Sequence, residues 1–322
     1  MPTDNYPYAV GRIRVLESGL LGDAKLARLA ELPYEAARKQ LADWGFAAEY
    51  PVREDVDGLI DFRRREIRDI IYELTPEPAL TDLFYLEYDA TNLKLLLKER
   101  LLGGGETVAA QLTPGIFDPV LLDDVTNTKD YTPLGEPLCS LMNDVEARMA
   151  LQSDPRVLSA MVDDAVFQFI FSALRTHKNE FCARYFRSKA DFTNILSLLR
   201  ARALRFSEND LAQMLVSGGS IPSDAITACL PLEAEQLAPR LVGEDNEKAV
   251  RAALSAYAAQ GVEAAAQALQ RALLDVGLLE WEDPFGIGPL AAFLLRGEYE
   301  CRALRRMFAR KRAGATGGVT NG

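Results

Sequence analysis

The chain has 322 residues, of which 48% are hydrophobic and 26% are charged, a composition typical of a folded protein large enough for two or three domains. A formal net charge of −11 argues against a surface built for nucleic acid, because phosphate backbones are bound by Lys and Arg. The four cysteines form no CxxC pair, so neither a zinc knuckle nor a disulfide framework is predicted, and a reducing cytosol is expected.

No segment predicts membrane insertion. The N-terminus, MPTDNYPYAV, lacks the basic start and apolar stretch of a signal peptide. The longest nearly apolar run, at 166–174, is too short to cross roughly 30 Å of hydrocarbon. The sequence therefore predicts a soluble chain that meets a membrane only through another protein or at its surface.

Helical periodicity dominates the chain from end to end. The run from Ile60 to Leu74 has one apolar and one charged face and ends before Pro76. The stretch at 157–174 has an apolar face of helical period, so its VFQFIF segment is interpreted as helix and not as strand. An alanine-rich region at 247–279 predicts a helical hairpin that breaks at Gly261. The fold class expected is all-α.

An internal repeat organises the chain. The segments 89–102 (DATNLKLLLKERLL) and 191–204 (DFTNILSLLRARAL) share seven of fourteen residues without a gap. Weaker echoes occur at 8–22 and at 300–314, where Leu304 and Arg305 align with Leu93 and Lys94. The spacing exceeds that of common solenoid repeats, so the sequence predicts one small helical bundle used about three times.

The repeated Asp-x-Thr-Asn has two interpretations. Asp and Thr are favoured at helix starts, where their side-chain oxygens accept free N–H groups, and this structural interpretation is preferred. In the functional interpretation, Asn92 and Asn194 bind a partner at equivalent edges of the repeat.

Residue patterns for catalysis are missing from the sequence. The single histidine, His177, cannot make a His-rich metal site, and no glycine-rich segment continues into a phosphate-binding fingerprint. Neighbouring acids such as Asp163 and Asp164 point about 100° apart on a helix and are interpreted as solvated charge. No catalytic residue, cofactor or metal is predicted.

The C-terminal helix carries an excess of positive charge in an otherwise acidic protein. Its cations pair either with acids of the same chain or with an acidic partner subunit, and both alternatives stand. Three of them are candidate partner-binding residues: Arg302, Arg305 and Arg306.

Three segments give the chain a family resemblance: YPYAVGRIRVLESGLL at 6–21, YLEYDATNLKLLLKERLLGG at 85–104, and FLLRGEYECRALRRMFARKRAG at 293–314. The chain resembles the C subunit of V/A-type ATPases, which is the d subunit of the eukaryotic V-ATPase. The family closes with a helix of the kind LLxKExExRxLRxxxxxK, and Gly297 stands here where the family usually has the Lys of KE.

The resemblance implies an all-α fold of three pseudo-repeated three-helix bundles arranged as a funnel. The first would span 1–80, completed by 275–313, the second 81–180 and the third 181–274, before a disordered tail at 314–322. It also implies a non-catalytic central-stalk subunit, cytoplasmic and peripheral to the membrane. This subunit docks the central shaft of the ATPase head onto the membrane proteolipid ring, and so couples ATP hydrolysis or synthesis to ion translocation.

Two alternatives remain from the residues alone. One is a general α-helical scaffold or regulatory binding module in the cytosol, which the repeat fits equally well. The other is an enzyme that uses acidic residues in a helical pocket, which requires a carboxylate of perturbed pKa.

Overall fold

A computed structural model describes residues 5–103, 112–113, 115–151, 154–243 and 246–317, and within them every regular element is a helix. The expected all-α class is therefore confirmed. The chain divides into two compact units, one formed by Met1–Thr81 with Gly277–Gly322 and the other by Asp82–Val276. The division into three bundles and their arrangement as a funnel stay predictions.

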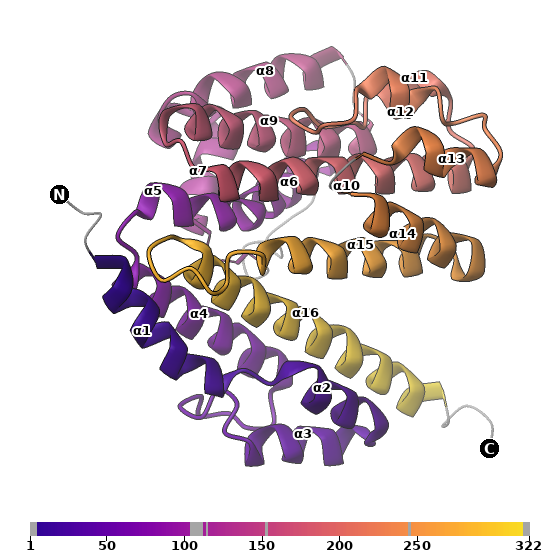
Figure 1. Cartoon of the computed structure of the whole chain (residues 1–322). Coiled ribbons are helices and arrows are strands. Elements are labelled where there is room, and N and C mark those ends of the chain that lie inside the picture. The colour runs from indigo at the N-terminus through magenta and orange to yellow at the C-terminus, as the bar shows by residue number, and fades with distance from the viewer. Residues whose placement is uncertain (1–4, 104–111, 114, 152–153, 244–245, 318–322) are drawn as a thin grey trace. The chain divides into compact units, whose positions relative to one another are not determined.

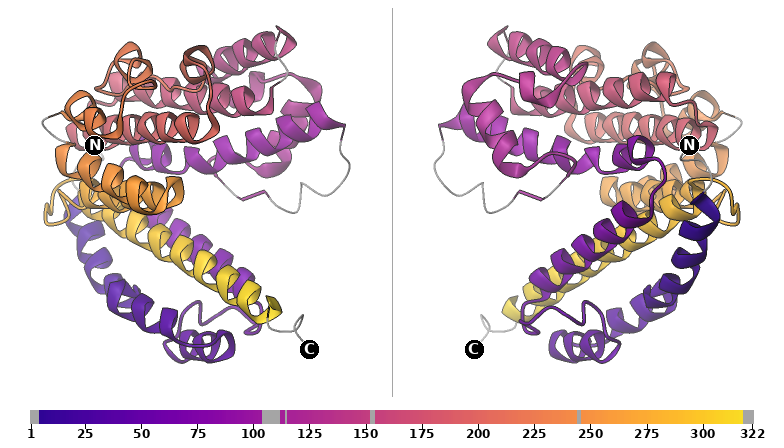
Figure 2. Two further views of the ribbon diagram at one scale, coloured as in Figure 1. Left: turned by 90° about the vertical axis from the view of Figure 1, so that its right-hand side faces the viewer. Right: turned by 90° about the vertical axis from the view of Figure 1, so that its left-hand side faces the viewer.

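The first unit combines the N-terminal and C-terminal segments of the chain. Its helices are α1 (Tyr6–Leu16), α2 (Gly22–Glu31), α3 (Tyr34–Asp43), α4 (Val56–Leu74), the short α5 (Pro78–Thr81) and α16 (Gly288–Gly317). The helices α4 and α16 lie side by side and run antiparallel (Figures 1 and 2). The core between them and α2 and α3 includes Leu59, Ile60, Cys301, Leu304 and Phe308.

The sequence of α4 explains its position. Asp55 precedes the helix and its carboxylate accepts a hydrogen bond from the Gly58 backbone N–H at 3.0 Å, which satisfies one of the free donors of the first turn. The predicted apolar face is buried, including Ile60, Ile67 and Ile71. Opposite this face Gly297 lies so close that an added Cβ would stand 2.3 Å from Ile67 Cδ1. Glycine at position 297 thus lets α16 pack closely against Ile67 of α4.

The first half of the second unit packs around α6. Its helices are α6 (Leu86–Leu102), α7 (Pro119–Thr128), α8 (Leu138–Leu151) and α9 (Pro155–Thr176). The segment at 166–171 is helical within α9, as predicted. The apolar stretch extends beyond the run at 166–174, because the 22-residue α9 contains an 18-residue window whose composition would suit a membrane span. Half of that window is buried inside the protein, as in the core helix of a bundle.

The second half of this unit packs around α10. Its helices are α10 (Glu180–Leu204), α11 (Glu208–Ala212), α12 (Ser223–Thr227), α13 (Ala234–Leu241), α14 (Glu247–Gln260) and α15 (Val262–Gly277). Gly261, with φ of 82°, separates α14 from α15 and confirms the predicted hairpin. The core of this half includes Ile195, Leu198, Leu237, Val250 and Ala265, none of which is exposed.

The C-terminal helix extends further than expected. Residues from Gly314 were predicted to form a disordered tail, but α16 continues through Gly317. Residues 318–322 lie outside the described part of the chain.

Candidate partner-binding surfaces

The acidic residue of the repeat holds a loop in both copies within the second unit. Asp89 of α6 accepts hydrogen bonds from the backbone N–H groups of Ile116 (2.8 Å) and Phe117 (3.3 Å). Asp191 of α10 accepts them from the Ile221 N–H (3.0 Å) and the Ser220 hydroxyl (2.5 Å). The residue just before each hydrogen-bonded loop segment is a glycine, Gly115 or Gly219. A Cβ atom at either position would stand within 2.4 Å of the Asp carboxylate, so a larger residue would clash there. The buried carboxylates thus fasten the segment that follows each long helix.

The asparagine one turn later fixes the same loop through both atoms of its amide. Asn92 donates to the Thr113 carbonyl oxygen at 2.7 Å and accepts from the Thr113 N–H at 3.0 Å. Asn194 does the same with Val216, at 2.9 and 2.8 Å. Both asparagines are 1% exposed. A role for them in partner binding would therefore act through the loops that they hold.

An arginine near the end of the repeat binds the helix that comes after the loop. Arg100 donates to the carbonyl oxygen of Thr126 in α7, and to Glu146 at 2.5 Å. The equivalent Arg202 donates to three carbonyl oxygens beyond α12, those of Cys229 (3.2 Å), Leu230 (2.8 Å) and Leu232 (2.6 Å). Free carbonyls at helix ends carry partial negative charge, so a guanidinium stabilises them.

The first unit makes the same contacts with residues of different type. In the alignment of 300–314 with 89–103, Glu300 takes the place of Asp89, and Lys311 takes that of Arg100. Glu300 accepts hydrogen bonds from the N–H groups of Leu21 (2.9 Å) and Gly22 (2.8 Å), the latter the first residue of α2. Lys311 donates to carbonyl oxygens at the end of α2, that of Ala30 at 2.8 Å and that of Leu32.

The fastened loop precedes the long helix in this third copy, whereas it follows the helix in the other two. The asparagine position is occupied by Ala303, so the bidentate contact is missing from α16. Burial raises the pKa of Glu300, and the hydrogen bonds from Gly22 and Leu21 oppose that shift. Three long helices therefore carry an acid and a cation at the same two positions, each holding the two ends of a short helical segment.

These contacts correct the preferred interpretation of Asp-x-Thr-Asn as a helix start. Asp191 lies in the middle of the 25-residue α10, whose cap is Asn179. The hydroxyls of Thr91 and Thr193 each donate to the carbonyl four residues earlier in their own helix, at 2.8 Å. The motif is structural, as expected, but its Asp and Asn side chains bind a loop distant in sequence, although Asp89 does lie in the first turn of α6.

The cations of α16 are expected to meet either this protein's own acids or a partner's, and the structure shows internal pairs for Arg305 and Arg312. Arg305 lies 2.6 Å from Asp61, and Arg312 lies 2.7 Å from Asp57. Arg296 stacks over the Trp281 ring, whose other neighbour is Arg14. Arg302 and Arg306 are half-buried on the same helix. Side chains of the Arg305–Asp61 pair are 39% and 47% exposed, so a partner can still reach them.

Two acids interpreted as solvated charge have structural roles. Asp163 of α9 pairs with Lys94 of α6 at 2.6 Å. Asp164, which points to another side of α9, accepts hydrogen bonds from the Ser217 N–H (2.7 Å) and the Gln168 amide (2.8 Å). The sequence shows two neighbouring acids on a helix but not which polar groups face them.

Sequence reasoning also missed Arg202 and Lys311. Arg202 is one of the seven identities of the repeat, so a signal was present. For Lys311 the sequence shows only a positive charge, because its contacts lie 279 and 281 residues away.

Among the described residues, no group of three or more His, Cys, Asp and Glu side chains is placed to hold a metal ion. The single histidine, His177, is exposed at the end of α9.

Comparison with known proteins gives matches over nearly the full length of the chain. The family model described as ATP synthase (C/AC39) subunit matches residues 9–316. The C subunit of the A-type ATP synthase of Pyrococcus abyssi is 22% identical over 320 residues, covering 93% of this chain and 85% of that protein. The protein of the same description from Methanothermobacter thermautotrophicus is 22% identical over 335 residues, covering 96% and 85%. The chain therefore belongs to the ATP synthase (C/AC39) subunit family.

Proposed function

We propose that this protein is a non-catalytic central-stalk subunit of a V/A-type ATPase. In this role it docks the shaft of the soluble head onto the membrane proteolipid ring and couples ATP hydrolysis or synthesis to ion translocation. Membership of the family supports the proposal most directly. Its two relatives are named as the C subunits of A-type ATP synthases, and both match along most of their length.

The repeated loop contacts are the structural observation that supports a mechanical role. A coupling subunit must pass force between partners without rearranging. Buried Asp and Asn side chains that are hydrogen-bonded to the backbone hold a loop in one geometry, since breaking these bonds strands polar groups away from water. Short helical segments held at both ends, by Asp89 and Arg100 or by Asp191 and Arg202, are suited to that task.

The five candidate residues take different parts in this proposal. Asn92 and Asn194 act indirectly, by holding the backbone at Thr113 and Val216 in place for a partner. Arg302, Arg305 and Arg306 present positive charge along α16 to an acidic partner subunit. In an intact complex the protein would lie on the cytoplasmic side, peripheral to the membrane and bound through the proteolipid ring.

A pull-down tests the proposal. The tagged full-length chain is recovered from its native membranes in mild detergent, and the proteins that accompany it are identified by mass spectrometry. Recovery of head, shaft and proteolipid subunits is expected. Recovery of unrelated soluble proteins alone would instead favour a general helical scaffold.

Charge reversal separates partner binding by α16 from its internal ion pair. The double substitution R302E with R305E should reduce recovery of the other subunits. In the variant R305E with D61R the Arg305–Asp61 pair is rebuilt with its signs exchanged while the outward charge of α16 changes, and D61R alone controls for the loss of the Asp61–Arg64 contact at 3.8 Å. If the other subunits are also lost from R305E with D61R, Arg305 binds an acidic partner. If they are recovered as with the wild type, Arg305 acts only through its internal pair with residue 61.

A further inference from the structure

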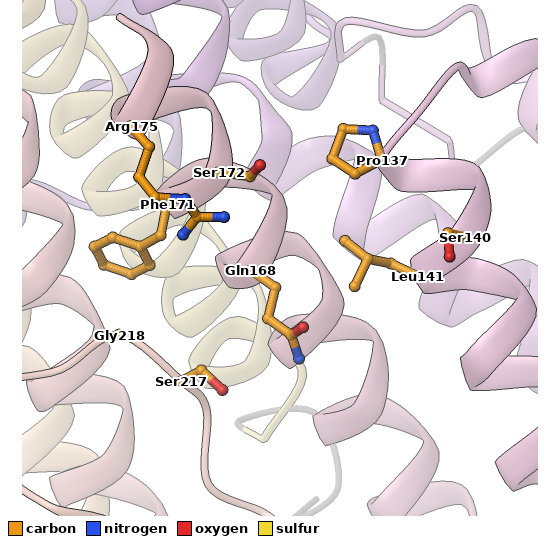
Figure 3. Close-up of a pocket in the computed structure, with 9 residues that line it drawn as sticks. All are labelled: Pro137, Ser140, Leu141, Gln168, Phe171, Ser172, Arg175, Ser217 and Gly218. Carbon is orange, nitrogen blue, oxygen red and sulfur yellow. The ribbon is translucent and has the colours of Figure 1, made fainter. Parts of the chain in front are cut away.

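A pocket of about 360 Å³ lies within the second unit, between α8, α9 and the loop after α11 (Figure 3). Its lining residues are Pro137, Ser140, Leu141, Gln168, Phe171, Ser172, Arg175, Ser217 and Gly218. Figure 3 shows Gln168, Ser172 and Arg175 along α9, with Ser140 and Leu141 of α8 across the opening. The proposed function makes no use of this pocket.

The charge on the lining of the pocket is positive. Arg175 is the one charged residue that lines it, and among the described residues Arg175 has no ion-pair partner. The nearby Asp164 does not line the pocket; its carboxylate keeps its charge and accepts hydrogen bonds from the Ser217 N–H and the Gln168 amide. Ser140, Ser172 and Ser217 add hydroxyl donors, while Phe171, Leu141 and Pro137 form an apolar wall. A ligand with one negative charge next to an apolar group complements this lining.

The wall formed by the loop is held in a single geometry. Gly218 has φ of 92°, and a Cβ there would stand 1.9 Å from the ring of Phe171, so the backbone lies directly against the ring. The residue before Ser217 is Val216, which Asn194 fixes through two hydrogen bonds. The repeat contact therefore shapes one side of the pocket before any ligand arrives, which lowers the entropy cost of binding.

We infer that this pocket receives an acidic side chain from a partner protein, with its carboxylate on Arg175 and a neighbouring apolar residue against Phe171 and Leu141. One guanidinium balances one carboxylate, and a planar bidentate contact suits the two groups. A doubly charged phosphate would leave a negative charge unbalanced. A small free carboxylate would leave the apolar wall uncovered. The inference rests on the proposed function only in taking the partner to be another subunit of the same complex.

The position of Arg175 has an ordinary explanation that the test must separate. It lies in the last turn of α9, where a cation stabilises the helix end whether or not a ligand binds. Arg148 is a matched control, because it too is an exposed arginine in the last turn of its helix, α8, and does not line the pocket.

The experiment places a photo-cross-linking amino acid at Ser140, on the rim of the pocket, in the full-length protein within its native complex. The same probe at Arg148 gives the background. We expect a cross-link from position 140 to a partner segment that contains Asp or Glu, identified by mass spectrometry. In the protein that carries the probe at position 140, R175Q should lower the cross-linking yield by about tenfold or more, as expected for loss of a charge-assisted hydrogen bond. R175K should lower this yield by less, and R148Q should not change it.

Three outcomes would overturn the inference: no product above background, a product with a lipid or a small molecule, or a yield unchanged by R175Q. An unchanged circular dichroism spectrum shows that each variant remains folded. If the ATPase subunits co-purify but position 140 gives no product, the pocket assignment fails and the proposed function stands. If no ATPase subunit co-purifies while position 140 still cross-links to another protein, the proposed function fails instead.

Discussion

Replacing Asn194 by alanine should strongly destabilise the second unit. The change removes both hydrogen bonds to Val216, which is 3% exposed, so its N–H and C=O lose their partners out of reach of water. An unsatisfied buried polar group costs about 1–3 kcal/mol, so the two together cost about 2–6 kcal/mol. That is a large share of the roughly 5–15 kcal/mol that holds a typical protein folded.

Thr193→Ala is the matched control from the adjacent position. The Thr193 hydroxyl donates only to the Lys189 carbonyl of its own helix, so its loss should change the free energy of unfolding by less than about 0.5 kcal/mol. Urea denaturation followed by circular dichroism measures the helices of both units. Tryptophan fluorescence measures the first unit, because both tryptophans, Trp44 and Trp281, belong to it.

Hydrogen exchange at the Val216 amide supplies a local measurement. Exchange there should speed up in Asn194→Ala and stay slow in Thr193→Ala, because the amide oxygen of Asn194 is the acceptor that protects it. If Asn194→Ala unfolds at the urea concentration of the wild type and keeps Val216 protected, the loop is held by other contacts and the reasoning fails.

Three further predictions concern the first unit and the thiols. Gly297→Ala brings a Cβ to 2.3 Å from Ile67 Cδ1, so it should be tolerated better in an Ile67→Val background, because valine lacks that atom; a double-mutant cycle in urea measures this coupling, and strictly additive effects would contradict it. Burial raises the pKa of Glu300, so its carboxyl group holds a proton more tightly in the folded protein than in the unfolded chain. The free energy of unfolding of the wild type, relative to that of Glu300→Gln, should therefore fall as pH rises from 4.5 through the raised pKa. A difference between the two proteins that does not change with pH would contradict this. Burial raises the pKa of Cys301 to about 12, so its thiol should not react with a thiol reagent at about pH 8 in the native protein. The half-buried Cys139 should be modified instead, and Cys139→Ser should abolish modification of the native protein.

The sequence by itself determined the fold class and the family. Helical periodicity needs only the spacing of apolar residues, so α4, α9 and the α14–α15 hairpin were predicted in the right places. The repeat was also visible, because two of its copies kept the same residue types at Asp89 and Asp191. The three motif segments indicated the family through their residue identities alone.

The tertiary structure decided what the repeated polar residues do. A buried Asp or Asn must find hydrogen-bond partners, but the partner is set by which backbone groups the packing brings within about 3 Å. In α16 the acid is Glu300 and the cation is Lys311, and their partners lie near the opposite end of the chain. The residue types differ in this third copy but the contacts are the same. Asp and Glu carboxylates can both accept hydrogen bonds from backbone N–H groups, and Arg and Lys can both donate to carbonyl oxygens.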